Sequence, residues 1–168
     1  MIAELGAAGP GDAPALATLC REHAAYERLA TCVDDVGFEA RLAAALAARR
    51  LHTWLAWREG QALGYVSLTL DFATLGAQPF AHMDCLYLRP AARGQGLGAK
   101  LLRQALDFAA AQGCAELQWQ TPDWNEGAQR FYLRAGATAL DKKRFVLALP
   151  PGLTYCAGTA RPPRTARW

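Results

Sequence analysis

Residues 81–111, AHMDCLYLRPAARGQGLGAKLLRQALDFAAA, contain an apolar strand pattern, a turn with three glycines in five positions, and a long helical pattern. The turn, from Arg93 to Gly98, places small residues where the helical pattern begins, so its backbone N–H groups can approach a ligand without hindrance from a Cβ atom. The start of a helix attracts anions because its N–H groups are unpaired and its dipole is positive there. This stretch therefore predicts a turn that binds a phosphate or pyrophosphate group.

The composition is that of a globular protein, with 168 residues of which 52% are hydrophobic and 20% are charged. We expect one domain over residues 1–149, followed by a Pro/Arg-rich tail over residues 150–168 that is extended or disordered. The chain has no uninterrupted apolar run long enough to span a membrane, and its beginning lacks the pattern of a secretory signal. These features favour a cytoplasmic protein.

The net charge of +3 comes from the tail, because Arg161, Arg164 and Arg167 lie in a segment without acidic residues. The remaining body is balanced, so it offers no electrostatic surface for nucleic acid, and we expect no nucleic-acid partner. The five cysteines are odd in number and form no CxxC pair. They therefore predict reduced thiols rather than a metal site or a disulfide framework.

Apolar periodicity predicts a chain that alternates between helices and strands. Asp12 and Asn125 are the expected helix caps, and Gly113 and Gly136 the expected helix stops. The predicted elements are a strand at 2–5, helices at 12–29 and 38–49 separated by a loop at 31–36, a hairpin over 52–72, a strand at 80–88, a helix at 96–112, a strand at 115–120, a short helix ending at Arg134, and an antiparallel pair at 137–140 and 143–149. This pattern predicts an α/β (α+β) domain.

Several kinds of glycine-rich turn can be compared with RGQGLG. A dinucleotide site has GxGxxG within a βαβ unit, whereas these glycines are spaced GxGxG and follow an antiparallel hairpin. A nucleotide P-loop has Lys and then Ser or Thr after its last glycine, and Lys100 is followed by Leu101. The glycines alone are also compatible with a tight turn that binds no ligand.

Three segments resemble the GNAT superfamily of N-acetyltransferases. Arg93, Gly96 and Gly98 match its pyrophosphate loop, which has Arg or Gln, any two residues, Gly, any residue, and Gly or Ala. WNEGAQRFYLRAGA at 124–137 is similar to its second cofactor motif, in the wording of the diamine (spermidine/spermine) and thialysine N-acetyltransferases, and AAYERL at 24–29 resembles their first helix. The resemblance implies a GNAT fold, with a central mixed, mostly antiparallel sheet, helices on both faces, and splayed strands at the cofactor site.

The resemblance also implies that acetyl-CoA (coenzyme A) is the cofactor. In such folds, the strand before the loop binds the pantetheine arm through its backbone, and the loop amides hold the pyrophosphate. The implied cofactor-binding residues are Leu86, Tyr87, Leu88, Arg93, Gly94, Gln95, Gly96, Leu97, Gly98, Ala99, Asn125, Phe131 and Tyr132.

Two residues are candidates for catalysis. By resemblance, Tyr132 places its hydroxyl beside the thioester sulfur as general acid, and a tyrosine with an ordinary pKa of about 10 is protonated at neutral pH. The alternative is that Phe131 and Tyr132 are core aromatic residues. Asp84 interrupts an apolar strand, where a carboxylate is costly unless it is paired or functional. It is therefore a candidate base or amine-binding group, acting directly or through water, and the alternative is a carboxylate that faces solvent.

The acceptor would lie against the first helix. Tyr26 and Glu27 are the candidate substrate-binding residues, together with Asp84, and Asp34 and Asp35 could line the same wall. The alternative for each residue of this wall is a solvated helix face or a polar loop. We expect His23 and His52 to be packing or surface residues, because neither lies in a motif, and we expect the thiol of Cys85 to be inert.

The sequence therefore predicts an enzyme that transfers an acetyl group from acetyl-CoA directly to a small primary amine, polyamine-like or lysine-like. One alternative is a GNAT enzyme with another acceptor, an aminoglycoside or a protein N-terminus. Another is a non-catalytic acyl-CoA-binding regulatory protein. The resemblance also makes a homodimer a possible assembly.

Overall fold

The computed structural model describes residues 3–29 and 36–147. In this part the chain forms a sheet, four α-helices and two short 3-10 helices. The strands are β1 (Glu4–Ala7), β2 (His52–Arg58), β3 (Gln61–Ala73), β4 (Gln78–Leu88) and β5 (Leu117–Gln118). The helices are η1 (Pro10–Asp12), α1 (Ala13–Tyr26), α2 (Phe38–Ala47), η2 (Pro90–Ala92), α3 (Leu97–Ala111) and α4 (Glu126–Arg134).

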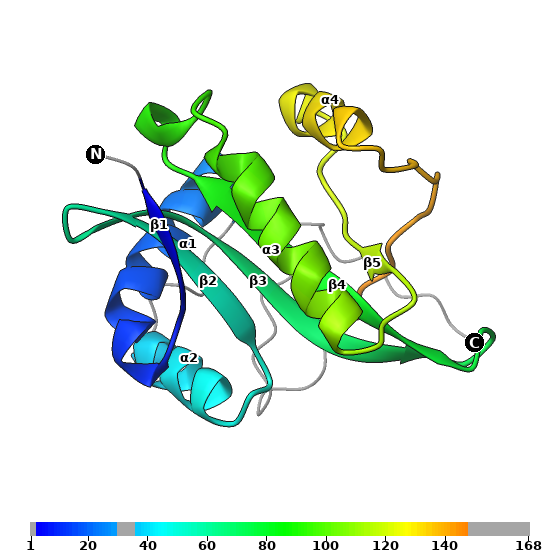
Figure 1. The fold of residues 1–168 in the computed structure, drawn as a ribbon, viewed down its shortest axis with the longest axis horizontal. Coiled ribbons are helices and arrows are strands. Elements are labelled where there is room, and N and C mark those ends of the chain that lie inside the picture. Colours follow the sequence, from blue (N-terminus) through cyan, green and yellow to red (C-terminus); the bar gives the residue numbers. More distant parts are fainter. Residues whose placement is uncertain (1–2, 30–35, 148–168) are drawn as a thin grey trace, which may run out of the picture.

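The strands lie side by side in the order in which they occur along the chain. Neighbouring strands from β1 to β4 are antiparallel, and β5 alone runs parallel to its neighbour β4. Figure 1 shows α3 crossing one face of this sheet, with α1 and α2 on the opposite face. The fold is therefore the predicted α/β arrangement of a mixed, mostly antiparallel sheet with helices on both faces.

Successive side chains of a strand point to opposite faces of the sheet and are buried in two separate cores. Val66 on β3 lies in the core under α3, whereas its neighbour Tyr65 lies in the core under α1 and α2. Leu101 and Leu19 are fully buried on their respective sides. Burying one such side chain stabilises the fold by about 1.5–3 kcal/mol, so both helical layers are strongly held against the sheet.

The strand β4 has a partner along only part of one edge. It pairs with β5 only at Ala81↔Leu117 and His82↔Gln118. Over its last residues, 85–88, β4 is paired with β3 on the other edge and with no strand on this one, within the described part of the chain. The two strands thus diverge towards the end of β4, as the splayed strands of the prediction require.

Gly64 lies where β3 passes closest to the end of β4. A Cβ atom at this position would collide with the Tyr87 carbonyl oxygen and with Leu88. We expect Gly64→Ala to lower the free energy of unfolding by about 2 kcal/mol, because backbone and a packed side chain would have to move apart. The measurement is urea unfolding followed by tryptophan fluorescence.

Gly6→Ala is the control for this substitution, because Gly6 also lies in a strand and its Cβ would meet only Trp57 at 4.0 Å. That variant should unfold within about 0.5 kcal/mol of the wild type. Equal stabilities for the two variants would contradict the close approach of β3 to β4.

Some predicted boundaries are wrong. The first helix ends at Tyr26 rather than Leu29, and the second at Ala47 rather than Arg49. In each case a residue just beyond the helix, Arg28 or Arg49, takes a positive φ that no helix continues through. Asp12 does not cap α1, because its carboxylate accepts a hydrogen bond from the Gly9 N–H at 2.8 Å and closes η1 instead.

The predicted strand at 115–120 is confined to Leu117–Gln118. The predicted final pair is wrong over residues 137–147, which form no strand. The large apolar side chains there are exposed, with Phe145 at 89% and Leu147 at 87%. Strand propensity alone does not hold a segment in a sheet without a surface to bury it against. Residues 148–149, Ile2, most of the 31–36 loop and the 150–168 tail lie outside the described residues.

The predicted helix signals around α3 and α4 are confirmed. The Asn125 side-chain oxygen accepts a hydrogen bond from the Ala128 N–H at 3.2 Å and caps α4. Gly113 and Gly136 follow the two helices with φ values of 72° and 91°, a conformation that glycine adopts without strain. None of the helices in residues 3–29 and 36–147 is both long and apolar enough to cross a bilayer.

Candidate functional site

A cavity of about 490 Å³ lies where β4 and β5 diverge, between the start of α3, the inner side of α4 and the end of α1. Its size is typical of a small-molecule site. The predicted site residues that line it are Tyr26, Glu27, Asp84, Leu86, Tyr87, Leu88, Arg93, Gly94, Gly96, Gly98, Ala99, Asn125, Phe131 and Tyr132. Segments that are far apart in sequence therefore meet at one place.

The glycine turn forms one end of the cavity with its backbone exposed. Gly94 and Gly96 have φ values of 72° and 77°, and Gly96 is the N-cap of α3. No atom lies within 4 Å of the position that a Cβ would occupy at either glycine. The unpaired amides at the start of α3 are thus open to an anion, with the helix dipole behind them.

The other two predicted residues of the turn point elsewhere. Leu97 is buried in the core under α3. The Gln95 side chain accepts a hydrogen bond from Arg58 at 2.7 Å and donates one to the Ala91 carbonyl at 2.8 Å. Both residues can therefore meet a ligand only through their backbone amides, while their side chains fix the shape of the turn.

Arg93 connects the turn to the helix on the far side of the cavity. Its Nε donates a hydrogen bond to the Leu88 carbonyl at 3.0 Å. Its guanidinium carbon lies 4.7 Å from the centre of the Tyr26 ring and 6.0 Å from that of Tyr87. These are cation–π distances, so the charge of Arg93 lies between the turn and α1.

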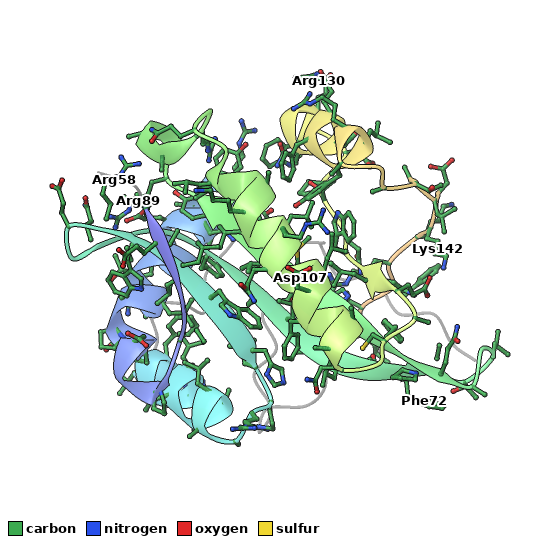
Figure 2. The ribbon with its side chains drawn as sticks, viewed as in Figure 1. Arg58, Phe72, Arg89, Asp107, Arg130 and Lys142 are labelled. Carbon is green, nitrogen blue, oxygen red and sulfur yellow. The ribbon has the colours of Figure 1, made fainter. Side chains whose placement is uncertain are left out.

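The helix α4 carries its aromatic residues towards the cavity. Figure 2 shows Arg130 on the outer side of α4, where it pairs with Glu126 at 3.0 Å. Tyr132 lies between Trp119 and Phe131, with ring centres 5.0 and 5.2 Å away. Burial raises the pKa of Tyr132 to about 12, so its phenol keeps its proton at neutral pH.

Asp84 is placed in the cavity by an irregularity of the sheet. Ser67 pairs with Cys85 and Leu68 with Met83, so Asp84 is an extra residue in β4. A bulge of this kind re-aims a side chain that would otherwise follow the strand's alternation. The carboxylate is exposed, lines the cavity and accepts a weak hydrogen bond from the Cys85 thiol at 3.5 Å.

The thiol of Cys85 is held in its protonated form. Burial, reinforced by the negative charge of Asp84, raises the pKa of Cys85 far above its ordinary value. A protonated thiol is a poor nucleophile. This agrees with the expectation that Cys85 is inert. No cluster of metal-ligating side chains occurs among the described residues.

The helix α1 forms the opposite wall and is tied to β4. Arg89, just after β4, makes a paired hydrogen bond to the Glu22 carboxylate at 2.7 and 2.9 Å. Tyr26 and Glu27 lie at the C-terminal end of α1 and face the cavity. Asp34 and Asp35 lie outside the described residues.

His23 also lines this wall, although the sequence favoured a packing or surface role. Its Nδ1 lies 3.0 Å from the Tyr65 hydroxyl, its Nε2 lies 3.3 Å from the Glu27 carboxylate, and its ring stacks on Tyr87 at 4.9 Å. One sequence signal could have placed His23 in the site. His23 precedes Tyr26 and Glu27 by three and four positions, and residues at this spacing lie on the same face of a helix. His52 stacks on Phe108 at 4.6 Å, as a packing residue would.

The arrangement of turn, splayed strand and helix agrees with the comparisons to known proteins. A family model described as Acetyltransferase (GNAT) family matches residues 16–137. The chain belongs to the GNAT acetyltransferase family. The match includes β4, the glycine turn and α4, so it covers the elements that build the cavity.

Curated GNAT relatives are named as N-acetyltransferases, which is the enzyme class of this chain. The Bacillus subtilis (strain 168) protein called uncharacterized N-acetyltransferase YhfO is 30% identical over 125 residues, covering 74% of this chain and 83% of that protein. A Bos taurus thialysine N-epsilon-acetyltransferase is 34% identical over 59 residues, 35% of each chain. The latter match thus spans about a third of the bovine protein's length.

A solved GNAT structure has the same fold. It is an aminoglycoside acetyltransferase from an uncultured soil metagenomic sample, in complex with trehalose, with a TM-score of 0.76 and 19% identity. The superposition covers 89% of this chain and 97% of that one. At this identity the likeness establishes the architecture, which is the GNAT fold predicted from the glycine turn.

GNAT enzymes use acetyl-CoA as acyl donor, and the residues present fit that molecule. The amides of the turn are open where a Cβ would otherwise block a pyrophosphate. The edge of β4 at 84–88 lacks a partner strand among the described residues. Apart from the Leu88 carbonyl, which accepts a hydrogen bond from Arg93, the amide and carbonyl groups that point outward there are open to the amides of a pantetheine arm.

Proposed function

We propose that the protein transfers an acetyl group from acetyl-CoA directly to a small primary amine that is polyamine-like or lysine-like. The observation that carries this proposal is that Asp84 and Tyr132 line the same cavity as the glycine turn and the free edge of β4. A carboxylate, a protonated phenol and an anion site are the groups that an acetyl transfer between a thioester and an amine needs.

The chain would position the donor through its backbone. The amides from Arg93 to Ala99 hold the pyrophosphate, and Leu86, Tyr87 and Leu88 bind the pantetheine arm through the open edge of β4. Asn125 and Phe131 shape the α4 side, because Asn125 fixes the start of that helix and Phe131 packs near Gly98. An amide of β4 polarises the acetyl carbonyl.

The chemistry is a direct displacement. Asp84 binds the ammonium form of the acceptor and takes up its proton, directly or through water. The free amine then attacks the carbonyl carbon, so that a C–N bond forms and the C–S bond breaks. Tyr132 donates a hydrogen bond to the departing sulfur. The nitrogen's second proton passes to that sulfur, so that the thiol of coenzyme A forms, and Asp84 releases the first proton to solvent. No covalent acyl-enzyme is needed, in keeping with the protonated thiol of Cys85.

The acceptor half of the cavity suits a cation. Glu27 and Asp84 supply negative charge. Tyr26 and Trp124 add an aromatic wall, with 5.7 Å between their ring centres, although the Arg93 guanidinium already lies over the Tyr26 ring. Carboxylates and aromatic faces both attract an ammonium group. The name of the bovine relative, thialysine N-epsilon-acetyltransferase, supports a lysine-like acceptor. A cytoplasmic location and a homodimer remain predictions.

The proposal is tested by thiol release from acetyl-CoA with polyamines, lysine analogues, aminoglycosides and peptides as acceptors. We expect turnover with one of the first two groups. Asp84→Asn should lower kcat/KM for that amine by about 100-fold, while the Kd for acetyl-CoA stays within about twofold, because the lost group acts only on the acceptor.

Asp71→Asn is the matched control, since Asp71 is an exposed aspartate whose carboxylate accepts a hydrogen bond from the Phe72 N–H. Figure 2 shows Phe72 on the protruding end of the β3–β4 hairpin, away from α4. Tight binding of acetyl-CoA without acetylation of any amine would instead support a non-catalytic acyl-CoA-binding protein. Turnover only with aminoglycosides or only with peptides would contradict the proposed polyamine-like or lysine-like acceptor.

A further inference from the structure

We propose that Tyr65 and His23 orient the Glu27 carboxylate towards the acceptor, so that His23 is a positioning residue for acceptor binding. This inference rests on the proposed function. It is carried by an unbroken set of contacts from the core under α1 to the cavity wall, Tyr65 to His23 at 3.0 Å and His23 to Glu27 at 3.3 Å.

The first step concerns the proton of Tyr65. Its side chain is 2% exposed, and burial raises the pKa of Tyr65 well above its ordinary value, so it remains a neutral phenol. The Cys20 thiol donates to the phenol oxygen at 3.6 Å. The phenol proton is then left for the best acceptor beside it, which is Nδ1 of His23.

The second step follows from this hydrogen bond. A neutral imidazole carries one proton, so an Nδ1 that accepts leaves the proton on Nε2. Nε2 lies 3.3 Å from the Glu27 carboxylate oxygen, so an N–H there attracts that negative oxygen electrostatically. Both ring nitrogens are thereby engaged. His23 has no lone pair for the acceptor amine, so it positions Glu27 instead of acting as a base.

The third step concerns how firmly the ring is held. His23 stacks on Tyr87 with an interplanar angle of 22°, and its side chain is 13% exposed. The hydrogen-bonded pair of Glu22 and Arg89 fixes α1 against the end of β4. These contacts favour one orientation of the ring, which directs Nε2 at a carboxylate that lies just after the last residue of α1.

Glu27 needs this support because it follows the helix. A glutamate at a helix end has several rotamers, and holding one of them costs conformational entropy on each binding event. With the His23 N–H in place, the Glu27 carboxylate is already aimed into the cavity. Loss of the His23 contact should therefore raise the KM of a cationic acceptor, with little change in the Kd of acetyl-CoA or in kcat.

The test compares variants in steady-state kinetics with the best amine of the panel. His23→Phe keeps the stacking on Tyr87 and removes the donor, and we expect the acceptor KM to rise by about 10-fold. His23→Gln can place an N–H near Nε2, and its KM should remain within about threefold of the wild type. His52→Phe, which alters a histidine stacked on Phe108 outside the cavity, should leave KM unchanged.

Glu27→Gln should raise KM at least as much as His23→Phe does, because it removes the charge that His23 positions. The double variant should lose no more than Glu27→Gln alone, because His23 acts only through Glu27. An unchanged KM in His23→Phe, or fully additive losses, would overturn the proposal. Urea unfolding of each variant shows whether a loss comes from stability instead.

A second measurement tests the contact between Tyr65 and His23 without relying on enzymatic activity. The chain has three histidines, so nitrogen-15 NMR of the imidazoles, assigned with the His23→Phe and His52→Phe variants, reports the tautomer of His23. We expect Nε2–H in the wild type and a changed signal in Tyr65→Phe. An Nδ1–H tautomer would overturn the proposal. If the protein acetylates no amine, the proposed function fails, while this measurement still decides the contact between Tyr65 and His23.

Discussion

Tyr132→Phe is expected to lower kcat by about 100-fold, which is the size of the effect of losing one donor that stabilises negative charge in a transition state. The Kd for acetyl-CoA should stay within about twofold, since the hydroxyl acts on the sulfur only as the C–S bond breaks. Single-turnover acetyl transfer and calorimetric titration with acetyl-CoA measure the two quantities separately.

The pKa of Tyr132 defines what this hydroxyl can do. Burial raises it to about 12, whereas an ordinary thiol has a pKa of about 8.5. Complete transfer of the proton to a free thiolate would therefore be uphill. The phenol is better suited to donate a strong hydrogen bond that stabilises the developing negative charge on sulfur in a water-poor cavity.

Leu133→Ala provides the control, because Leu133 is the exposed neighbour of Tyr132 on α4 and its loss should leave kcat unchanged. Stability should also be kept in Tyr132→Phe, since the phenylalanine ring can occupy the same space. Turnover within about threefold of the wild type would remove Tyr132 from the chemistry.

Gly96→Ala is expected to weaken the binding of acetyl-CoA by about 10- to 100-fold, the effect of losing one hydrogen bond to a charged group. The methyl group would stand in the open space above the first amides of α3, where the pyrophosphate is proposed to lie. Direct titration with acetyl-CoA measures the loss of affinity. Titration with pantetheine, a fragment of coenzyme A that lacks the pyrophosphate, shows whether the loss depends on that group.

Gly113→Ala is the control that separates the effect of backbone strain from the effect of a lost contact with the ligand. Gly113 has a φ of 72°, close to the 77° of Gly96, and likewise has no atom within 4 Å of a Cβ position. Both variants should lose about 1 kcal/mol of stability from the left-handed backbone. Only Gly96→Ala should weaken the binding of acetyl-CoA, and pantetheine should bind both variants equally. Equal affinities for acetyl-CoA would contradict the assignment of the turn.

Local sequence signals predicted much of this site, because they act within a few residues. The glycines at 94, 96 and 98 mark a turn before a helix, and Asn125 caps the next helix through a contact three residues away. Asp84 is conspicuous because a carboxylate interrupts an apolar strand. In each case the physical requirement can be stated without knowing what lies across the fold.

What the sequence did not predict depends on contacts between distant segments. The bulge that directs Asp84 arises from the register between β3 and β4, and a register is set by packing of the whole sheet. His23 contacts Tyr65, which lies 42 residues later in the sequence, so no local periodicity could predict that contact. The predicted strands at 137–140 and 143–149 failed over the described residues for the opposite reason, since their local pattern found no surface to pack against.

The short pairing between β4 and β5 has a consequence for solubility. A strand edge with free amide and carbonyl groups is a template on which another chain can add a strand. Here the same edge, residues 84–88, forms the floor of a cavity that α4 closes on one side. Since α4 lies beside this edge, a strand that added there would have to take the space that a slender ligand is proposed to fill, so we expect bound ligand to protect the edge from pairing with another chain.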